Sequence, residues 1–232
     1  MKLNTNSNIY TFVYMTVVVV IVAVLLAVVS SALKPLKDAN VLLDKQKQIL
    51  GALKFDLDSL DTDPATKYLS LVNDTLTFGE KEVYVANLDG EVKYILPLEG
   101  KGLWGGIGGY LVLNEDKNTI YGVNFNHEGE TPGLGAKITE YEIFRKQFEG
   151  THIRNEEGKV VSVAVLKSGK IAEGKDQVDA ISGATITSEG VSKMLEEELI
   201  NNYKEFLSDV PAAEENVEPI EEKEAEDVES ED

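Results

Sequence analysis

An uncharged apolar segment near the N-terminus constrains the fold of this chain more than any other feature of the sequence. Residues 9–32 carry no charged side chain and consist mainly of Val, Ile, Leu and Ala. At ~1.5 Å per residue, an α-helix of this length is long enough to cross a hydrocarbon core of ~30 Å. We therefore predict a transmembrane helix at residues 9–32, after a short N-terminal segment at residues 1–8.

A cleaved signal peptide is the alternative to a retained helix. Ser30, Ser31 and Ala32 would form an acceptable cleavage site of small residues. The apolar run is longer than the usual signal-peptide core of about 7–15 residues, and the segment before it carries only Lys2. The length of the run favours a retained helix.

The charges that flank the apolar segment do not decide its orientation. One lysine precedes it, and four follow it closely: Lys34, Lys37, Lys45 and Lys47. Taken literally, the positive-inside rule favours a cytoplasmic C-terminal domain, but large domains translocate despite such charges. The residues alone therefore leave both orientations open.

The composition argues against several classes of function. The chain has no cysteine, which removes disulfides, thiolate metal sites and iron–sulfur ligation. Its two histidines are too few for a His-rich metal site, so we expect no metal centre. The net charge of −19 argues against binding nucleic acid. The motifs of metalloproteases, serine hydrolases and P-loop triphosphatases do not occur.

Negative charge is concentrated at the C-terminal end. Eleven of the 21 residues at 212–232 are acidic and one is a lysine. With Pro219 in it, Pro211 directly before it and few large apolar residues, this segment cannot bury enough surface to offset the entropy of ordering. We predict that residues 209–232 form a disordered acidic tail.

The rest of the chain shows strand and helix patterns. Residues 33–78 are expected to hold a juxtamembrane helix, at 41–55, and a loop, at 56–74. Residues 79–208 are expected to form a domain with strands at 82–87, 91–96, 110–114, 119–125 and 159–166, and helices at 138–148 and 188–207. Hairpins followed by helices predict an α+β fold with a mixed, largely antiparallel sheet and packed helices.

Two glycine-rich stretches could approach a ligand closely. Residues 100–109 contain G-x-G-x-x-G, but no helix pattern follows, so we reject a dinucleotide fingerprint. A flexible loop remains, in which Trp104, the only tryptophan, either covers a flat ring or fills the core. In the second stretch, residues 128–136, Thr131 offers a hydroxyl and Leu134 an apolar surface. Its many special residues favour a functional loop over a long polar turn.

Residues 179–185 (DAISGAT) place a threonine on a glycine-containing turn ahead of an amphipathic helix that is expected to start at about Ser188. A helix N-terminus has unpaired N–H groups and a partial positive charge, and so suits a phosphate. Ser, Thr and Asp also occur at ordinary helix N-termini. On its own, the segment fits a simple cap equally well.

Three segments, taken together and in this order, resemble a known family. They are residues 100–104 (GKGLW), 129–135 (GETPGLG) and 182–188 (SGATITS). From the apolar helix to about residue 207, the chain resembles the C subunit of the sodium-translocating NADH:quinone oxidoreductase. The third segment is shared with the G subunit of Rnf electron-transport complexes and with other FMN-binding domains, whereas the first points to the C subunit of the sodium-translocating enzyme.

The resemblance implies that residues 79–208 are a covalent FMN-binding domain. A separate flavin transferase would join the FMN phosphate to Thr185 as a phosphodiester. The motif recognised for attachment would comprise Asp179, Ser182, Gly183 and Ala184. The residues that line the flavin would be Trp104, Glu130, Thr131, Leu134 and Gly135.

The resemblance also implies a place in the cell and a set of partners. The chain would be a single-pass protein of the bacterial inner membrane with its flavin domain in the periplasm. It would relay electrons from NADH towards quinone within a complex that exports Na⁺, and it would need the other subunits for activity. Two alternatives stay open: the flavin subunit of an Rnf-type complex, and a membrane-anchored binding module without flavin.

Overall fold

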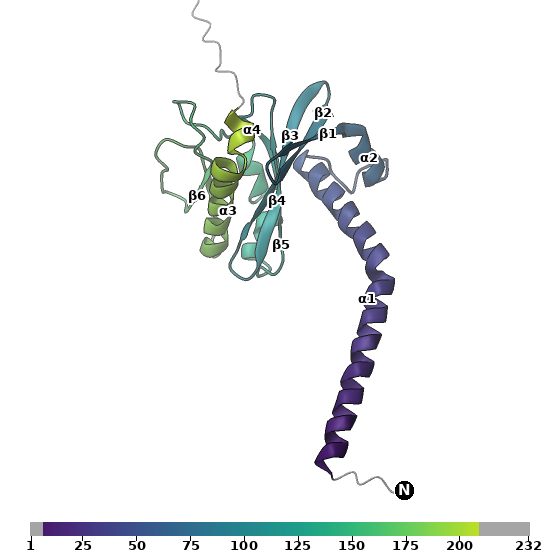
Figure 1. Cartoon of the computed structure of the whole chain (residues 1–232). Coiled ribbons are helices and arrows are strands. Elements are labelled where there is room, and N and C mark those ends of the chain that lie inside the picture. The colour runs from purple at the N-terminus through teal and green to yellow at the C-terminus, as the bar shows by residue number, and fades with distance from the viewer. Residues whose placement is uncertain (1–6, 209–232) are drawn as a thin grey trace, which may run out of the picture.

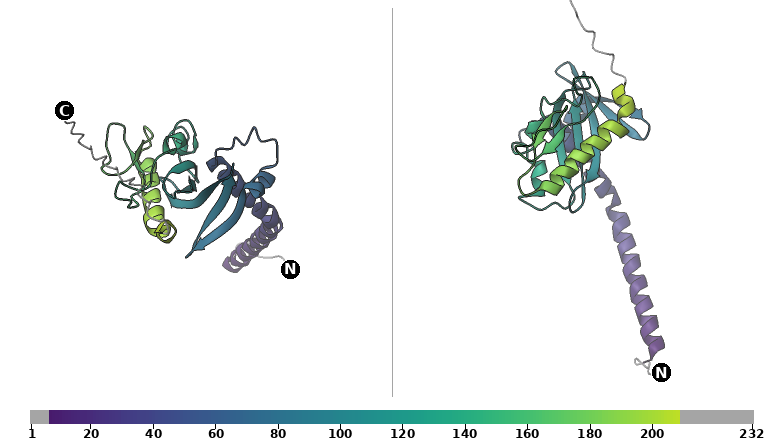
Figure 2. Two further views of the ribbon diagram at one scale, coloured as in Figure 1. Left: turned by 90° about the horizontal axis from the view of Figure 1, so that it is seen from above. Right: turned by 90° about the vertical axis from the view of Figure 1, so that its left-hand side faces the viewer.

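The computed structural model describes residues 7–208. The predicted acidic tail, at residues 209–232, lies outside the described residues, as do residues 1–6. A long N-terminal helix leads into a five-stranded antiparallel sheet (Figure 1). Seen from above, the N-terminal helix and the C-terminal helix cover opposite faces of that sheet (Figure 2). The chain therefore has the predicted α+β fold.

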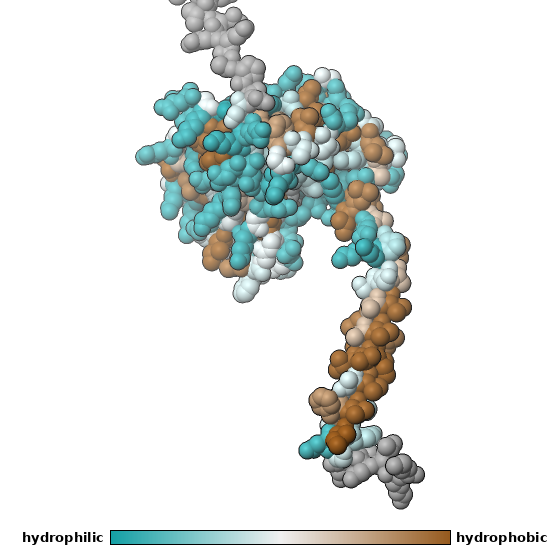
Figure 3. Space-filling model, in the orientation of Figure 1, coloured by the Kyte–Doolittle hydropathy of each residue, from teal (hydrophilic) through white to brown (hydrophobic). Residues whose placement is uncertain are grey.

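The predicted transmembrane and juxtamembrane helices form one element. Helix α1 spans Asn8–Ala52, with Ser7 as its N-cap. Its apolar part stands away from the domain as a continuous hydrophobic surface (Figure 3). An 18-residue window of α1 has a mean hydropathy of 3.1 and none of it is buried, so by length and composition this helix could cross a membrane.

The segment predicted as a loop at residues 56–74 contains a helix and the start of a strand. Helix α2 spans Pro64–Leu71. Asp63 is its N-cap, accepting hydrogen bonds from the N–H groups of Ala65 and Thr66, and Pro64 takes the first helical position. Asp followed by Pro is a favourable helix start. The loop prediction was therefore wrong, and the Asp63–Pro64 pair was the signal that could have indicated the helix.

The main sheet has the order β1-β2-β3-β4-β5, and all neighbours are antiparallel. Four of its strands confirm predicted ones, while β1 was missed because its sequence, VNDTLTF, is largely polar. The glycine stretch at 100–109 is mostly strand, since β3 and β4 extend into it and leave only residues 102–105 as the turn. The strand bounds are β1 Val72–Phe78, β2 Lys81–Leu88, β3 Glu91–Lys101, β4 Gly106–Leu113 and β5 Ile120–His127.

The C-terminal part differs from its prediction in several elements. The helix expected at 138–148 is replaced by two short 3₁₀ helices, η1 Gly135–Thr139 and η2 Arg145–Phe148. Apolar residues three apart suit a 3₁₀ helix as well as an α-helix, so the pattern alone did not separate the two. Of the strand predicted at 159–166, only β6 Ala164–Leu166 forms, and it pairs in parallel with β7 Gln177–Asp179.

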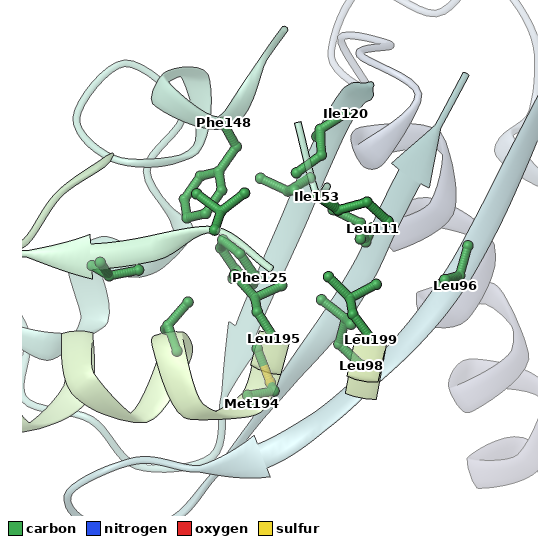
Figure 4. Packing of buried hydrophobic residues seen from close by; sticks show 14 of the residues in the cluster. Leu96, Leu98, Leu111, Ile120, Phe125, Phe148, Ile153, Met194, Leu195 and Leu199 are labelled. Atoms are coloured by element: carbon green, nitrogen blue, oxygen red, sulfur yellow. The ribbon is translucent and has the colours of Figure 1, made fainter. Parts of the chain in front are cut away.

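The predicted C-terminal helix is present but begins earlier. It starts at Thr185 rather than Ser188, as α3 Thr185–Glu197, and continues through a π-helical turn, η3 Glu198–Asn202, into α4 Lys204–Ser208. Its apolar side packs on the sheet, where Met194, Leu195 and Leu199 meet the side chains of β3 and β4 (Figure 4). Phe125, Phe144 and Phe148 extend this core with ring centroids 5.4 to 5.8 Å apart.

A second core fixes the end of α1 on the other face of the sheet. Ile49, Leu50 and Leu53 pack there against strand residues that include Ile95 and Val112. Arg145 joins this end of α1 to the rest of the domain, because its guanidinium donates to three carbonyl oxygens. The acceptors are those of Gly51 (3.0 Å), Val123 (2.9 Å) and Thr139 (3.2 Å).

The last turns of α1 run antiparallel to β5. The side chain of Asn126 donates to Gln48 Oε1 (2.6 Å), and Asn124 donates to the Gln48 carbonyl oxygen (2.9 Å). Further along, a methyl group placed on Gly122 would lie 2.5 Å from the Ala52 carbonyl oxygen. Since β5 ends at His127, the loop after it lies at the end of the sheet that faces back along α1 towards the apolar segment (Figure 1).

We expect Gly190→Ala to destabilise the domain by about 1–3 kcal/mol, the usual cost of overpacking. A methyl group on Gly190 would lie 2.5 Å from the backbone oxygen of Lys101, so α3 and β3 would have to move apart. Urea unfolding of the full chain in detergent, followed by circular dichroism, measures the change.

Gly129→Ala is the matched control, because a methyl group there has no heavy atom within 4 Å among the described residues. Equal urea midpoints for Gly190→Ala and Gly129→Ala would contradict the close contact between α3 and β3.

Candidate functional site

Three segments that are distant in sequence meet at one end of the sheet. They are the turn between β3 and β4, the loop after β5, and the start of α3. Glu130 connects them, since Oε1 accepts a hydrogen bond from the Trp104 N–H (2.9 Å) and Oε2 accepts one from the Thr187 hydroxyl (2.6 Å). Leu134 reaches the third segment, where a methyl group on Gly183 would lie 3.0 Å from Leu134 Cδ2. The structure thus brings together the three segments that carry the family resemblance.

Thr185 is the first residue of α3 and is half-buried. Ala184 occupies the N-cap position, and within residues 7–208 no side chain caps this helix. The chain enters the helix through Gly183, whose φ of +80° suits glycine. Because the first-turn N–H groups of a helix have no intrahelical acceptor, an uncapped start leaves donors free for an anion such as a phosphate on Thr185.

Thr187 differs from Thr185 although it lies only two residues further on. Its side chain is 1% exposed and its hydroxyl donates to Glu130. Ser188 is also buried, and its hydroxyl accepts a hydrogen bond from the Ile181 N–H (3.1 Å). Of these three hydroxyl residues, Thr185 is therefore the one that solvent and a modifying enzyme can reach.

Exposed apolar side chains lie on each of the three segments that meet at this end of the sheet. Trp104 is 70% exposed, which shows that its interpretation as core filler is wrong. Leu103, Leu134 and Ile186 are each exposed by between 43% and 55%. They come from all three segments, which Glu130 connects, and we refer to these four side chains as the apolar platform. Exposed apolar surface of this kind suits the face of a planar ring.

Glu130 is itself buried, with 4% of its surface exposed. Burial alone would raise the pKa of this carboxyl. The hydrogen bonds from the Thr187 hydroxyl and from the Trp104 and Leu103 backbone, together with His127, outweigh that effect and hold the pKa below its usual value. Glu130 is therefore an ionised carboxylate enclosed by the site rather than a side chain on its surface.

The other predicted site residues are distributed between surface and interior. Thr131, Ser182 and Gly183 are exposed, and Asp179 is exposed at the end of β7. Gly135 is buried, and a methyl group on it would lie 2.4 Å from Glu130 Oε2. Thr131 shapes its loop through its backbone, because its carbonyl oxygen accepts from the N–H groups of Leu134 (3.1 Å) and Ala136 (3.2 Å).

Four residues at the site were missed at the sequence level. Leu103 and Ile186 contribute to the platform, Thr187 bonds Glu130, and His127 Nδ1 accepts the Glu130 N–H (3.3 Å). Leu103, Ile186 and Thr187 lie inside the segments 100–104 and 182–188, which carry the family resemblance, so their position in these segments could have identified them as site residues. His127 has no signal of its own, because its contact depends on the turn that follows β5.

Comparisons with known proteins agree on this region. A model of the family described as FMN-binding domain matches residues 102–199. The chain is 39% identical over 107 residues to the C subunit of the Na(+)-translocating NADH-quinone reductase of Vibrio vulnificus (strain YJ016), covering 46% of this chain and only 41% of that protein. It is 27% identical over 231 residues to the C subunit from Haemophilus ducreyi, covering 82% of this chain and 89% of that one.

A solved structure extends the similarity to the fold. The crystal structure of the C subunit of the Na(+)-translocating NADH-quinone reductase from Parabacteroides distasonis superimposes with a TM-score of 0.70 at 39% identity. The match covers 76% of this chain and 97% of that one. The mixed α+β fold is therefore shared with that C subunit.

The lowered pKa of Glu130 predicts part of the acid sensitivity of the fold. A depressed folded-state pKa contributes stability that is complete above the unfolded value of 4.5 and is lost as pH falls through the folded value. Between about pH 7 and pH 3, Glu130→Gln should therefore lose less stability than the wild type, as measured by urea midpoints at each pH.

Glu128→Gln is the control, because it removes an exposed carboxylate of the same loop. It should keep the wild-type pH dependence. If Glu130→Gln also kept the wild-type pH dependence of stability, Glu130 would not be a source of the acid sensitivity.

Proposed function

Because the chain belongs to the family of C subunits of Na(+)-translocating NADH-quinone reductases, we propose that it is a flavoprotein subunit that carries FMN and passes electrons within such a complex. One observation supports this most: a half-buried threonine at an uncapped helix start lies on one of the three segments that carry the apolar platform, inside the region that matches the FMN-binding domain. These relatives are all named as the C subunit of the sodium-translocating enzyme, which favours this complex over one of the Rnf type.

In this proposal, Thr185 carries the FMN through a phosphodiester that a separate flavin transferase forms. Among the hydroxyl residues in the first turn of α3, Thr185 is the one that is not buried, and the free N–H groups of that turn would hold the phosphate oxygens. Asp179, Ser182 and Gly183 are exposed beside Thr185 in sequence, so the transferase could read them as its attachment motif. Ala184 is buried and would fix the turn.

The residues around Thr185 would hold the ring and keep water from one of its faces. Trp104 and Leu134 offer exposed apolar surface from two different loops, while Thr131 presents a hydroxyl and Gly135 keeps the backbone close to Glu130. When bound, the flavin supplies the electron-transfer chemistry, and the protein tunes it through packing and charge. A covalent link would let the subunit cycle without losing its cofactor.

The proposal also places the chain in the bacterial inner membrane. Residues 9–32 of α1 would span the membrane, and residues 79–208 would form the flavin domain on the periplasmic side. Because the site lies at the end of the sheet that faces back along α1, its platform would be near the membrane surface and within reach of membrane-embedded subunits of the complex.

The attachment residue is testable by mass. Protein made in a host with the flavin transferase should carry one FMN less one water, and peptide fragmentation should place this mass on Thr185. Thr185→Ala should lose the label completely, because Thr187 and Ser188 are buried and the exposed Ser182 precedes the first turn of α3.

Thr187→Ala is the control, since it removes the buried neighbouring hydroxyl, and it should stay labelled. Loss of the label in Thr187→Ala alone would move the attachment to Thr187, and an unlabelled wild type would contradict the flavin proposal.

The orientation can be tested with single cysteines, because the chain has none of its own. Glu157 lies on the exposed surface of the domain, and Asn8 lies at the N-terminal end of α1. The two variants are Glu157→Cys and Asn8→Cys. In intact spheroplasts, a membrane-impermeant maleimide should label Glu157→Cys fully, while Asn8→Cys should react only after permeabilisation. The reverse pattern would place the domain in the cytoplasm.

A further inference from the structure

The turn that carries Trp104 projects from the end of the β3–β4 hairpin. Its own closing bond runs from the Gly102 N–H to the Gly105 carbonyl oxygen (2.9 Å). Because the indole is 70% exposed, side-chain packing contributes little to holding the turn. Its position therefore depends on hydrogen bonds to the loop after β5.

Glu130, whose side chain is buried, accepts one of these bonds. Its carboxylate accepts the Trp104 N–H through one oxygen and the Thr187 hydroxyl through the other. Thr187 lies in the first turn of α3, two residues beyond Thr185. One carboxylate thus links the backbone of Trp104 to the helix turn that starts with Thr185.

Glycine backbone encloses this carboxylate on two sides. A methyl group on Gly102 would lie 2.4 Å from Glu130 Oε1, and one on Gly135 would lie 2.4 Å from Glu130 Oε2. The two glycines therefore allow the close approach that the carboxylate needs, and they leave it little freedom to move. The negative charge of Glu130 also lies next to the N-terminal end of α3, where the helix dipole favours it.

We propose that Glu130 is a positioning residue that holds Trp104 in register with Thr185 and places a fixed negative charge at the candidate flavin site. It acts through Trp104 and Thr187 rather than by lining the ring. The charge makes the reduction potential more negative, because added electrons are repelled by a nearby carboxylate in a poorly solvated site. The effect on potential rests on the proposed function, whereas the hold on Trp104 does not.

The hold on Trp104 can be measured without flavin. Trp104 is the only tryptophan, so all indole emission reports on this turn. In the full chain carrying Thr185→Ala, Glu130→Ala should lower the steady-state anisotropy of that emission, because the turn loses its buried anchor. Glu130→Gln should keep the anisotropy, since a glutamine amide can accept from the Trp104 N–H and donate to the Thr187 hydroxyl oxygen.

Two further variants keep this test decisive. Glu128→Ala removes the exposed carboxylate that accepts the Gly106 N–H, and it should leave the anisotropy close to the wild-type value. Thr187→Val serves where Glu130→Ala fails to fold. It removes the hydrogen bond from the Thr187 hydroxyl to Glu130 and keeps those from the Trp104 and Leu103 backbone, so it should give an intermediate loss of anisotropy. Unchanged anisotropy in folded Glu130→Ala, or in Thr187→Val where Glu130→Ala does not fold, would overturn the positioning role.

The effect of the charge is read from the flavin-loaded full chain. Redox titration of Glu130→Gln should show a more positive midpoint potential than the wild type, with the Trp104 anisotropy unchanged. An equal potential in the two proteins would overturn the electrostatic part of the proposal. If the wild type carries no flavin, the proposed function fails, and the anisotropy series still decides whether Glu130 positions Trp104.

Discussion

The close approach of α3 to the β3–β4 hairpin is the constraint on which the rest of the structure depends. Gly190 faces the Lys101 carbonyl oxygen, and Gly100 faces Met194, at distances that leave no room for a side chain. Helix and strand therefore meet almost backbone to backbone. Only at this distance can one carboxylate, that of Glu130, reach both the turn of the hairpin and the first turn of the helix.

The two faces of the main sheet have different roles. One face packs on α3 and carries the candidate site, while the other face packs on the last turns of α1. Arg145 ties the two together, because it bonds the end of α1, strand β5 and the 3₁₀ helix that follows the candidate flavin loop. Helix α1, with its apolar N-terminal part, is thus a fixed extension of the domain rather than a segment on a linker, and the separate helices expected from the sequence are one.

The strongly patterned elements could be predicted, and the weakly patterned ones could not. Four strands and the C-terminal helix follow from alternation and from helical spacing, which depend on which side chains the core must bury. Strand β1 is largely polar and forms because β2 offers it a partner along its length. The apolar spacing at residues 138–148 fits two kinds of helix, and the bonds of Arg145 and the packing of Phe144 and Phe148 on Phe125 accompany the 3₁₀ form.

The sequence by itself determined the apolar helix, the α+β class and the three segments of the candidate site, because each depends on residues that are neighbours in the chain. The tertiary structure alone decided which threonine is accessible and what Glu130 does. The sequence does not distinguish the side chains of Thr185 and Thr187. In the structure, Thr185 starts helix α3 at the surface, whereas Thr187 donates to the buried carboxylate of Glu130, which is 57 positions away in the chain. Such a contact exists only once strand, loop and helix are packed together, since no local pattern encodes a distance between segments.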